Sequence, residues 1–499
     1  MAGMMPIRIQ ITLIFGMRRG QARRASAAAK RRRNAAGPRP ARRRCDFYVG
    51  AAPFLTSCLT EQECIVHADV LCTLRHGDGF LAERAERRRT SRMRGKTFGK
   101  KSMKKLATLL LAAGMTAAAA SPASAVDVKV DGRYQFQFQT GSEGFHGQNT
   151  DYALQRVRLG LTFIASENLS GYFQLQAGTH DWGTDTTGNS VDVTMRQAYV
   201  DWTVPSTDIK VRMGRHAFDL PAYASVSSMI ADLVADGVVV SVPFADRYNV
   251  TGFWTRMARD ANGEGDVTDV NAPKYDLFGL VGNASFDGLT VSPWAIYGTK
   301  GDATYVDGTR FSPSNLTDQG NISGQGRADI AIFGAGFEWK PFDPVTLALD
   351  AAYGFVKYDE SDDQEGWYAV GKAAYATSFG EPTLLAWYAS GDNRGRDENS
   401  GQIPIIYGDF NGTSTYFDNT FGPVGGHRYS FGGTWGVSAQ MNGMSFIDGL
   451  THDFSVTWFA GTNNKYNGDY GSGYDYLTTE DSAVEFDLLS TYEIYKNLH

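Results

Sequence analysis

The stretch Leu154-Gln155-Arg156-Val157-Arg158-Leu159-Gly160-Leu161-Thr162-Phe163 decides the fold. Its apolar positions alternate along the chain: Val157, Leu159, Leu161 and Phe163. The positions between them are polar or small: Arg156, Arg158, Gly160 and Thr162. Successive side chains of a β-strand point to opposite faces, so this period of two residues predicts a strand with one apolar face and one polar face.

The same alternation recurs along residues 126–499 in long segments. A strand that crosses a membrane needs about 9–11 residues, whereas globular strands average about 5–6. Short turns such as Asp287-Gly288 alternate with long polar loops, and aromatic residues such as Trp254 and Trp458 stand near segment ends. We therefore predict an all-β fold, a transmembrane antiparallel β-barrel with short periplasmic turns and long extracellular loops. The predicted strands, about 16 in number, cover residues 127–139, 152–165, 169–179, 191–204, 208–216, 237–245, 248–257, 274–286, 289–299, 328–340, 345–357, 367–379, 383–390, 428–441, 450–460 and 481–494.

Residues 1–102 have a different composition, with 23 Lys and Arg against 7 Asp and Glu. They also contain the four cysteines of the chain, Cys45, Cys58, Cys64 and Cys72, whose spacing matches no zinc-binding pattern. A basic arm that binds nucleic acid is the alternative interpretation. We instead predict that residues 1–102 are a disordered or spurious extension, and that the protein has no nucleic-acid partner.

A signal peptide follows this extension. Residues 103–105 are basic at two positions, residues 106–120 are mainly apolar, and Ala123-Ser124-Ala125 has the small-residue pattern of a cleavage site. The apolar run is about 15 residues long, too short for a helix that spans a bilayer. We predict a signal peptide at residues 103–125, cleavage after Ala125, and an exported barrel over residues 126–499.

Four motifs resemble a known family of channels. They are ALQRVRLG at residues 153–160, RQAYVDW at 196–202, VRMGRH at 211–216 and WYASGD at 387–392. In their order and spacing, the sequence resembles the homotrimeric outer-membrane porins of sulfate-reducing bacteria, and more distantly the general and phosphate-selective porins. The resemblance covers residues 126–499. It implies a homotrimer in the lipid of the cell outer membrane, through which ions and small hydrophilic solutes diffuse passively.

The C-terminal segment departs from that family. Porins of this kind usually end on a strand with a terminal aromatic residue, whereas this chain ends Tyr495-Lys496-Asn497-Leu498-His499. The ending has the composition of a turn, so we expect that the last hairpin is missing from a parent of 18 strands. A closed barrel of sixteen strands is the alternative.

The segment at residues 218–236 is the candidate constriction loop, because the resemblance implies a loop folded into the pore at this point. Charged groups across a pore select ions by charge. We predict an acidic side from Asp219, Asp232 and Asp236, and a basic side from the water-facing residues Arg156, Arg158, Lys210 and Arg212. The alternatives are turn chemistry for the aspartates and solvated wall or subunit-contact residues for the arginines.

Charge and motifs limit the remaining functions. Residues 126–499 hold 23 Lys and Arg against 47 Asp and Glu, which predicts weak cation selectivity at the pore mouth. The acidic stretch at residues 359–365 lacks the spacing of an EF-hand, so we predict a solvated loop and no metal or cofactor. The region has neither a G-x-S-x-G nor an H-E-x-x-H motif, so we predict that the protein is not an enzyme. The alternatives are a channel specific for phosphate or a sugar, and a structural outer-membrane protein that does not conduct.

Overall fold

The computed structural model describes residues 7–18, 126–141, 150–183, 191–259, 274–301, 322, 327–392, 399–408, 410, 412–413, 431–464 and 477–493. Within these ranges the regular structure consists of β-strands. No helix in this described part has the length and apolar character needed to span a membrane.

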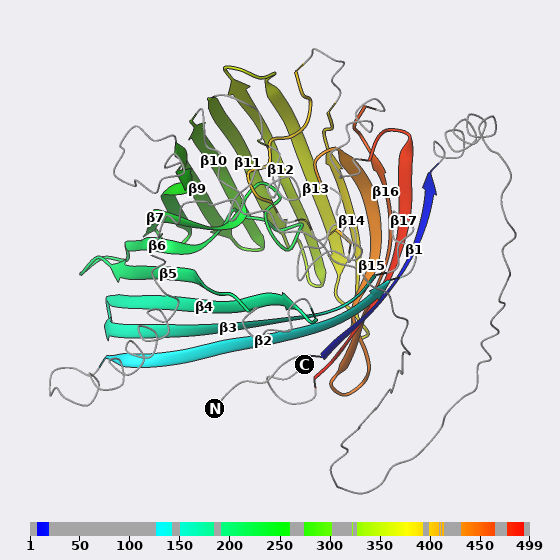
Figure 1. The fold of residues 1–499 in the computed structure, drawn as a ribbon, viewed down its shortest axis with the longest axis horizontal. Helices are drawn as coiled ribbons and strands as arrows, with labels where there is room; N and C mark the ends of the chain where they lie inside the picture. The colour runs from blue at the N-terminus through cyan, green and yellow to red at the C-terminus, as the bar shows by residue number, and fades with distance from the viewer. Residues whose placement is uncertain are drawn as a thin grey trace, which may run out of the picture. The chain divides into compact units, whose positions relative to one another are not determined.

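Sixteen strands, β2 to β17, follow one another in one sheet in chain order (Figure 1), each antiparallel to its neighbour. This confirms the predicted number of strands and the all-β class. The strands are β2 (Asp127–Gly141), β3 (Thr150–Ser166), β4 (Leu169–Asp181), β5 (Val193–Thr203), β6 (Lys210–Asp219), β7 (Asp232–Phe244), β8 (Tyr248–Arg259), β9 (Lys274–Phe286), β10 (Leu289–Lys300), β11 (Ala328–Trp339), β12 (Val345–Tyr358), β13 (Gln364–Tyr375), β14 (Glu381–Ala389), β15 (Thr434–Ile447), β16 (Leu450–Gly461) and β17 (Asp481–Tyr492).

A further strand, β1 (Ile7–Arg18), lies in the extension that we predicted to be disordered or spurious. It pairs antiparallel with β17, from Ile7 opposite Tyr492 to Arg18 opposite Asp481. Its sequence IRIQITLIFGMR alternates in the same way as the other strands, which gives a physical reason for the pairing. The assignment of residues 1–102 as a disordered or spurious extension stays a prediction. The predicted cleavage after Ala125 would separate β1 from the rest of the sheet.

Three predicted strand boundaries differ from the structure by more than four residues. Strand β7 begins at Asp232 instead of residue 237, because Asp232 pairs with Asp219 and extends the β6–β7 hairpin. Strand β15 begins six residues later than predicted, and it continues past residue 441 through a β-bulge that includes Gly443, whose φ is 68°.

Along strands β2 to β17, exposed apolar side chains on the outer face alternate with polar or buried side chains on the inner face. On β12, Leu349 is 44% exposed on one face, whereas Asp350 is 2% exposed on the other. Outward aromatic residues form two rows. At the ends with long connections they are Trp254, Phe278, Tyr297, Phe333, Tyr353, Trp367, Tyr388, Trp435 and Trp458, and at the ends with short turns they are Phe244, Tyr248, Phe286, Trp339, Tyr375, Phe379, Phe446 and Tyr492. Two rows of this kind are the expected girdles of a membrane barrel.

Candidate pore constriction

The connection between β6 and β7, residues 220–231, reaches the inner face of distant strands. The backbone N–H groups of Tyr223, Ala224 and Ser225 donate hydrogen bonds to the Asp350 carboxylate, with the shortest at 2.7 Å. Asp350 belongs to β12, well beyond β7 in the sheet. The loop therefore folds inward from β6 and β7 across the inner face of the sheet, and its role as a constriction stays a prediction.

A second set of contacts holds the tip of the loop against β9, β10 and β11. The Tyr223 hydroxyl lies 2.7 Å from the Ser292 hydroxyl, and Asn283 donates to both groups. A Cβ on Gly336 would lie 2.7 Å from the Tyr223 ring, so a larger residue there would displace the ring. The tip is thus fixed by hydrogen bonds and by a matching gap in the wall.

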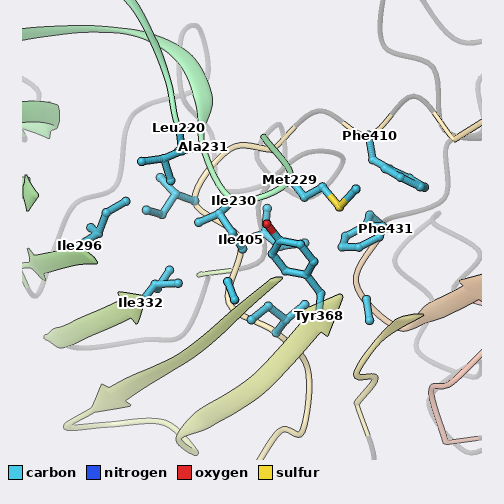
Figure 2. Packing of buried hydrophobic residues seen from close by; sticks show 14 of the residues in the cluster. Leu220, Met229, Ile230, Ala231, Ile296, Ile332, Tyr368, Ile405, Phe410 and Phe431 are labelled. Atoms are coloured by element: carbon cyan, nitrogen blue, oxygen red, sulfur yellow. The ribbon is translucent and has the colours of Figure 1, made fainter. Parts of the chain in front are cut away.

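Apolar packing completes the attachment of the loop (Figure 2). Leu220, Met229, Ile230 and Ala231 are at most 2% exposed and lie among Ile296, Ile332, Tyr368, Ile405, Phe410 and Phe431. Burying a leucine, isoleucine or methionine side chain stabilises the folded protein by about 1.5–3 kcal/mol. The loop is therefore part of a buried apolar core inside the sheet.

The inner face of β2 to β5 is different, because it carries a cluster of arginines. Arg133, Arg156, Arg158 and Arg196 lie close enough to repel one another electrostatically. Their side chains are half-buried or exposed, in contrast to the buried inner face of β10 to β14. We call these four residues the basic wall.

Glutamines of neighbouring strands orient three of these arginines. Arg156 Nε donates to Gln135 Oε1 at 3.0 Å, Arg158 Nε to Gln176 Oε1 at 2.8 Å, and Arg196 Nη1 to Gln174 Oε1 at 3.1 Å. An amide oxygen fixes a guanidinium without cancelling its charge. The wall can therefore attract anions.

Arg212 provides a contrast on the neighbouring strand. Its Nε and Nη2 donate to both oxygens of Asp201 at 2.6 and 2.7 Å, and its guanidinium lies 4.1 Å from the centre of the Tyr199 ring. A two-pronged ion pair of this kind balances the charge. Arg212, which we predicted to lie on the basic side, therefore adds little net charge to the pore.

The structure separates the other predicted site residues. Lys210 is the first residue of β6, at the end opposite the loop, so it lies away from the constriction. Asp236 is a strand residue rather than a loop residue; it is exposed, and its carboxylate lies 3.3 Å from Arg215.

Asp219 accepts a hydrogen bond from Ser228 N at 3.1 Å and so holds the base of the loop. Asp232 lies within electrostatic range of Arg196, which belongs to the basic wall. The predicted cleavage residues Ala123 and Ala125 lie outside the described residues.

Arg196 was missed because strict alternation assigns it to the outward face with Ala198 and Val200. A β-bulge opposite Gln174 and Leu175 inserts one residue into β5 at this point. The bulge turns Arg196 to the inner face, where it shares Gln174 as an acceptor with Gln197. Asp350 was missed as well, although a lone aspartate in an otherwise apolar strand is a visible signal of a specific partner.

Comparison with known proteins gives one sequence family and several structures. The family model described as phosphate-selective porin O and P matches residues 128–225, which include all four residues of the basic wall and the start of the inward loop. No curated protein matches the chain. Similar solved structures include OmpF of Salmonella typhi in complex with daunomycin, at 12% identity and TM-score 0.42, covering 74% of this chain and 98% of that one. Others are the anion-selective porin from Comamonas acidovorans (10%, TM-score 0.43, covering 73% and 99%) and OmpT of Vibrio cholerae (11%, TM-score 0.40, covering 73% and 97%).

Proposed function

We propose that residues 126–499 form an outer-membrane porin, through which ions and small hydrophilic solutes diffuse passively. The observation that carries this proposal is the loop at residues 220–231, pinned to Asp350 across the interior of a sheet whose outer face is apolar. A narrowed, polar passage inside an apolar exterior suits transport down a gradient and needs no catalytic group.

We propose further that the constriction favours anions. The acidic net charge predicts weak cation selectivity at the mouth, and that prediction stays untested. Inside the pore, however, Arg158 and Arg196 are oriented by neutral glutamines. Their field acts on an ion inside the pore, where charges interact more strongly than they do in bulk water. This observation supports the alternative of a channel for anions such as phosphate, and so does the family matched over residues 128–225.

Bilayer recordings test both proposals. Purified protein should give steady, ohmic channels in a planar bilayer, and a KCl gradient should give a reversal potential with the sign of anion preference. Absence of channels would favour the structural, non-conducting alternative. A cation-preferring potential would restore the prediction from net charge. Saturation of the current by phosphate or a sugar would identify a specific solute.

The proposed export route makes a prediction about the N-terminus. Protein taken from the outer membrane is expected to begin at Val126, because Ala123 and Ala125 fit the small-residue cleavage site. N-terminal sequencing or intact mass measures this directly. A chain that keeps residues 7–18 would instead retain β1 beside β17.

The proposed lipid contact makes a second prediction. Leu349→Arg is expected to destabilise the folded protein by about 2–4 kcal/mol, because Leu349 faces lipid near the middle of β12. Thr162→Arg on the inner face of β3 is the matched control, with little expected effect. Urea unfolding in lipid vesicles compares the two. Equal stabilities would contradict the assignment of the faces.

The resemblance to homotrimeric porins supports a trimer as the working assembly. A band on a non-heated gel at three times the mass of the heated chain is the expected result. A single monomer band in mild detergent would contradict it.

A further inference from the structure

A second inward segment, residues 400–408, runs beside the constriction loop. Ile406 N and Tyr407 N both donate to Ile230 O, at 3.0 and 3.1 Å. Asp232 N donates to Tyr407 O at 2.7 Å, so Ala231 and Tyr407 form a parallel β-bridge. These bonds join the backbones of two loops that are far apart in the sequence.

The second segment is also fixed to the wall behind it. Gln364 Nε2 on β13 donates to Gln402 O at 3.2 Å, and Ile403 N donates to Ser390 O at 3.4 Å. Ile403, Ile405 and Ile406 are at most 3% exposed. Because both ends of the contact are anchored, the loop at residues 220–231 and the segment at 400–408 act as one body.

The two loops approach each other too closely for an ordinary side chain. A Cβ on Gly408 would collide with the backbone carbonyl of Met229. Glycine permits this approach because it has no Cβ. The second loop therefore follows the first without space for water between their backbones at this point.

The burial of inner-face residues distinguishes a packed side and an open side of the interior. Inner-face residues of β10 to β14, such as Ile330, Val370 and Leu385, are buried under the two loops. Inner-face residues of β3 to β5, such as Arg158 and Gln174, are only partly buried. The water path must then run between the joined loops and the basic wall.

Tyr407 comes directly after the buried Ile405 and Ile406 of the second loop, and it is itself only partly buried. Its side chain is partly buried against the core, and its phenol lies within electrostatic range of Arg196 on β5. A residue that leaves the packed loops toward the opposite wall limits the width of the passage.

We infer that Tyr407 is a constriction residue supplied by the second loop, and that it sets the size limit of the pore while the basic wall sets its charge preference. The inference rests on the proposed porin function. It assigns pore width to two loops, whereas the sequence indicated one.

Removing the ring tests the inference. Tyr407→Ala should raise single-channel conductance by about 1.5-fold or more, and proteoliposomes should admit larger uncharged sugars in a swelling assay. The reversal potential should keep its sign, because the arginines remain. Tyr388→Ala, which removes an outward tyrosine from β14, is the matched control and should conduct as the unmodified protein does.

A chemical probe tests the same position if the alanine variant assembles poorly. Residues 126–499 contain no cysteine, so Tyr407→Cys would carry the sole thiol of a chain cleaved after Ala125. A water-soluble charged methanethiosulfonate should reduce its conductance, and the same reagent should leave Tyr388→Cys unchanged. Unaltered conductance and sugar cut-off in Tyr407→Ala, or an unreactive Tyr407→Cys, would overturn the inference while the porin function stands. Absence of channels in the unmodified protein would instead overturn the porin function.

Discussion

Asp350→Ala is expected to free the tip of the constriction loop and to raise single-channel conductance, with frequent switching between levels. The carboxylate accepts hydrogen bonds from three consecutive backbone N–H groups, at Tyr223, Ala224 and Ser225. Each hydrogen bond to a charged acceptor contributes about 1.5–3 kcal/mol. Without it, three donors lose their partner inside the sheet. We expect a conductance about twice that of the unmodified protein, recorded in planar bilayers.

A control separates this effect from the loss of any inner carboxylate. Asp487 lies on the inner face of β17 and accepts a hydrogen bond from Ser455 at 2.9 Å, remote in the sheet from the loop tip. Asp487→Asn should leave conductance and current noise unchanged. If Asp350→Ala conducts as quietly and as weakly as the unmodified protein, the loop is held by its apolar packing alone.

The double substitution Arg158→Gln and Arg196→Gln is expected to reverse the ion preference. Each guanidinium group is held by a neutral glutamine oxygen and not by a carboxylate. Its charge is therefore not balanced within the pair, and the substitution removes positive charge from the pore. The remaining charge near the constriction then includes Asp232 and Asp219. We expect the anion-to-cation permeability ratio to fall about tenfold, which corresponds to about 1.4 kcal/mol. Reversal potentials in a KCl gradient measure the ratio.

Arg256→Gln is the matched control for the arginines. Arg256 forms a two-pronged ion pair with Asp276 at 2.7 and 2.8 Å, and its guanidinium lies over the outward Trp254 ring. Removing this charge from the outer face should leave the permeability ratio unchanged. A double variant that retains anion preference would show that other residues determine the selectivity.

The strands were predictable because their signal is local. Alternation such as that of residues 154–163 follows from the geometry of an extended chain, and it needs no knowledge of distant partners. The inward loop after β6 was expected from the resemblance. Its anchor was not, since Tyr223 and Asp350 are 127 residues apart and nothing near either residue identifies the other.

The second loop and the bulge were hidden for different reasons. The apolar run at residues 403–406 stands out within a polar connection and was a visible sign of burial, although its partner Ile230 is distant in sequence. The bulge at Arg196 leaves no such sign, because one inserted residue changes the face of a side chain without changing composition. Site residues on irregular backbone are therefore the ones that pattern analysis loses.

The pinning of residues 220–231 also bears on the order of assembly. The loop is made early in the chain, yet its anchors on β12 and at residues 400–408 come much later. Contacts of such long sequence separation form only after the intervening chain is in place. Strands β2 to β14 must therefore be in place before the loop at residues 220–231 can dock on its anchors. A chain whose folding stops earlier would leave a pore without the loop that narrows it. The permeability of the membrane would then report how far folding has progressed.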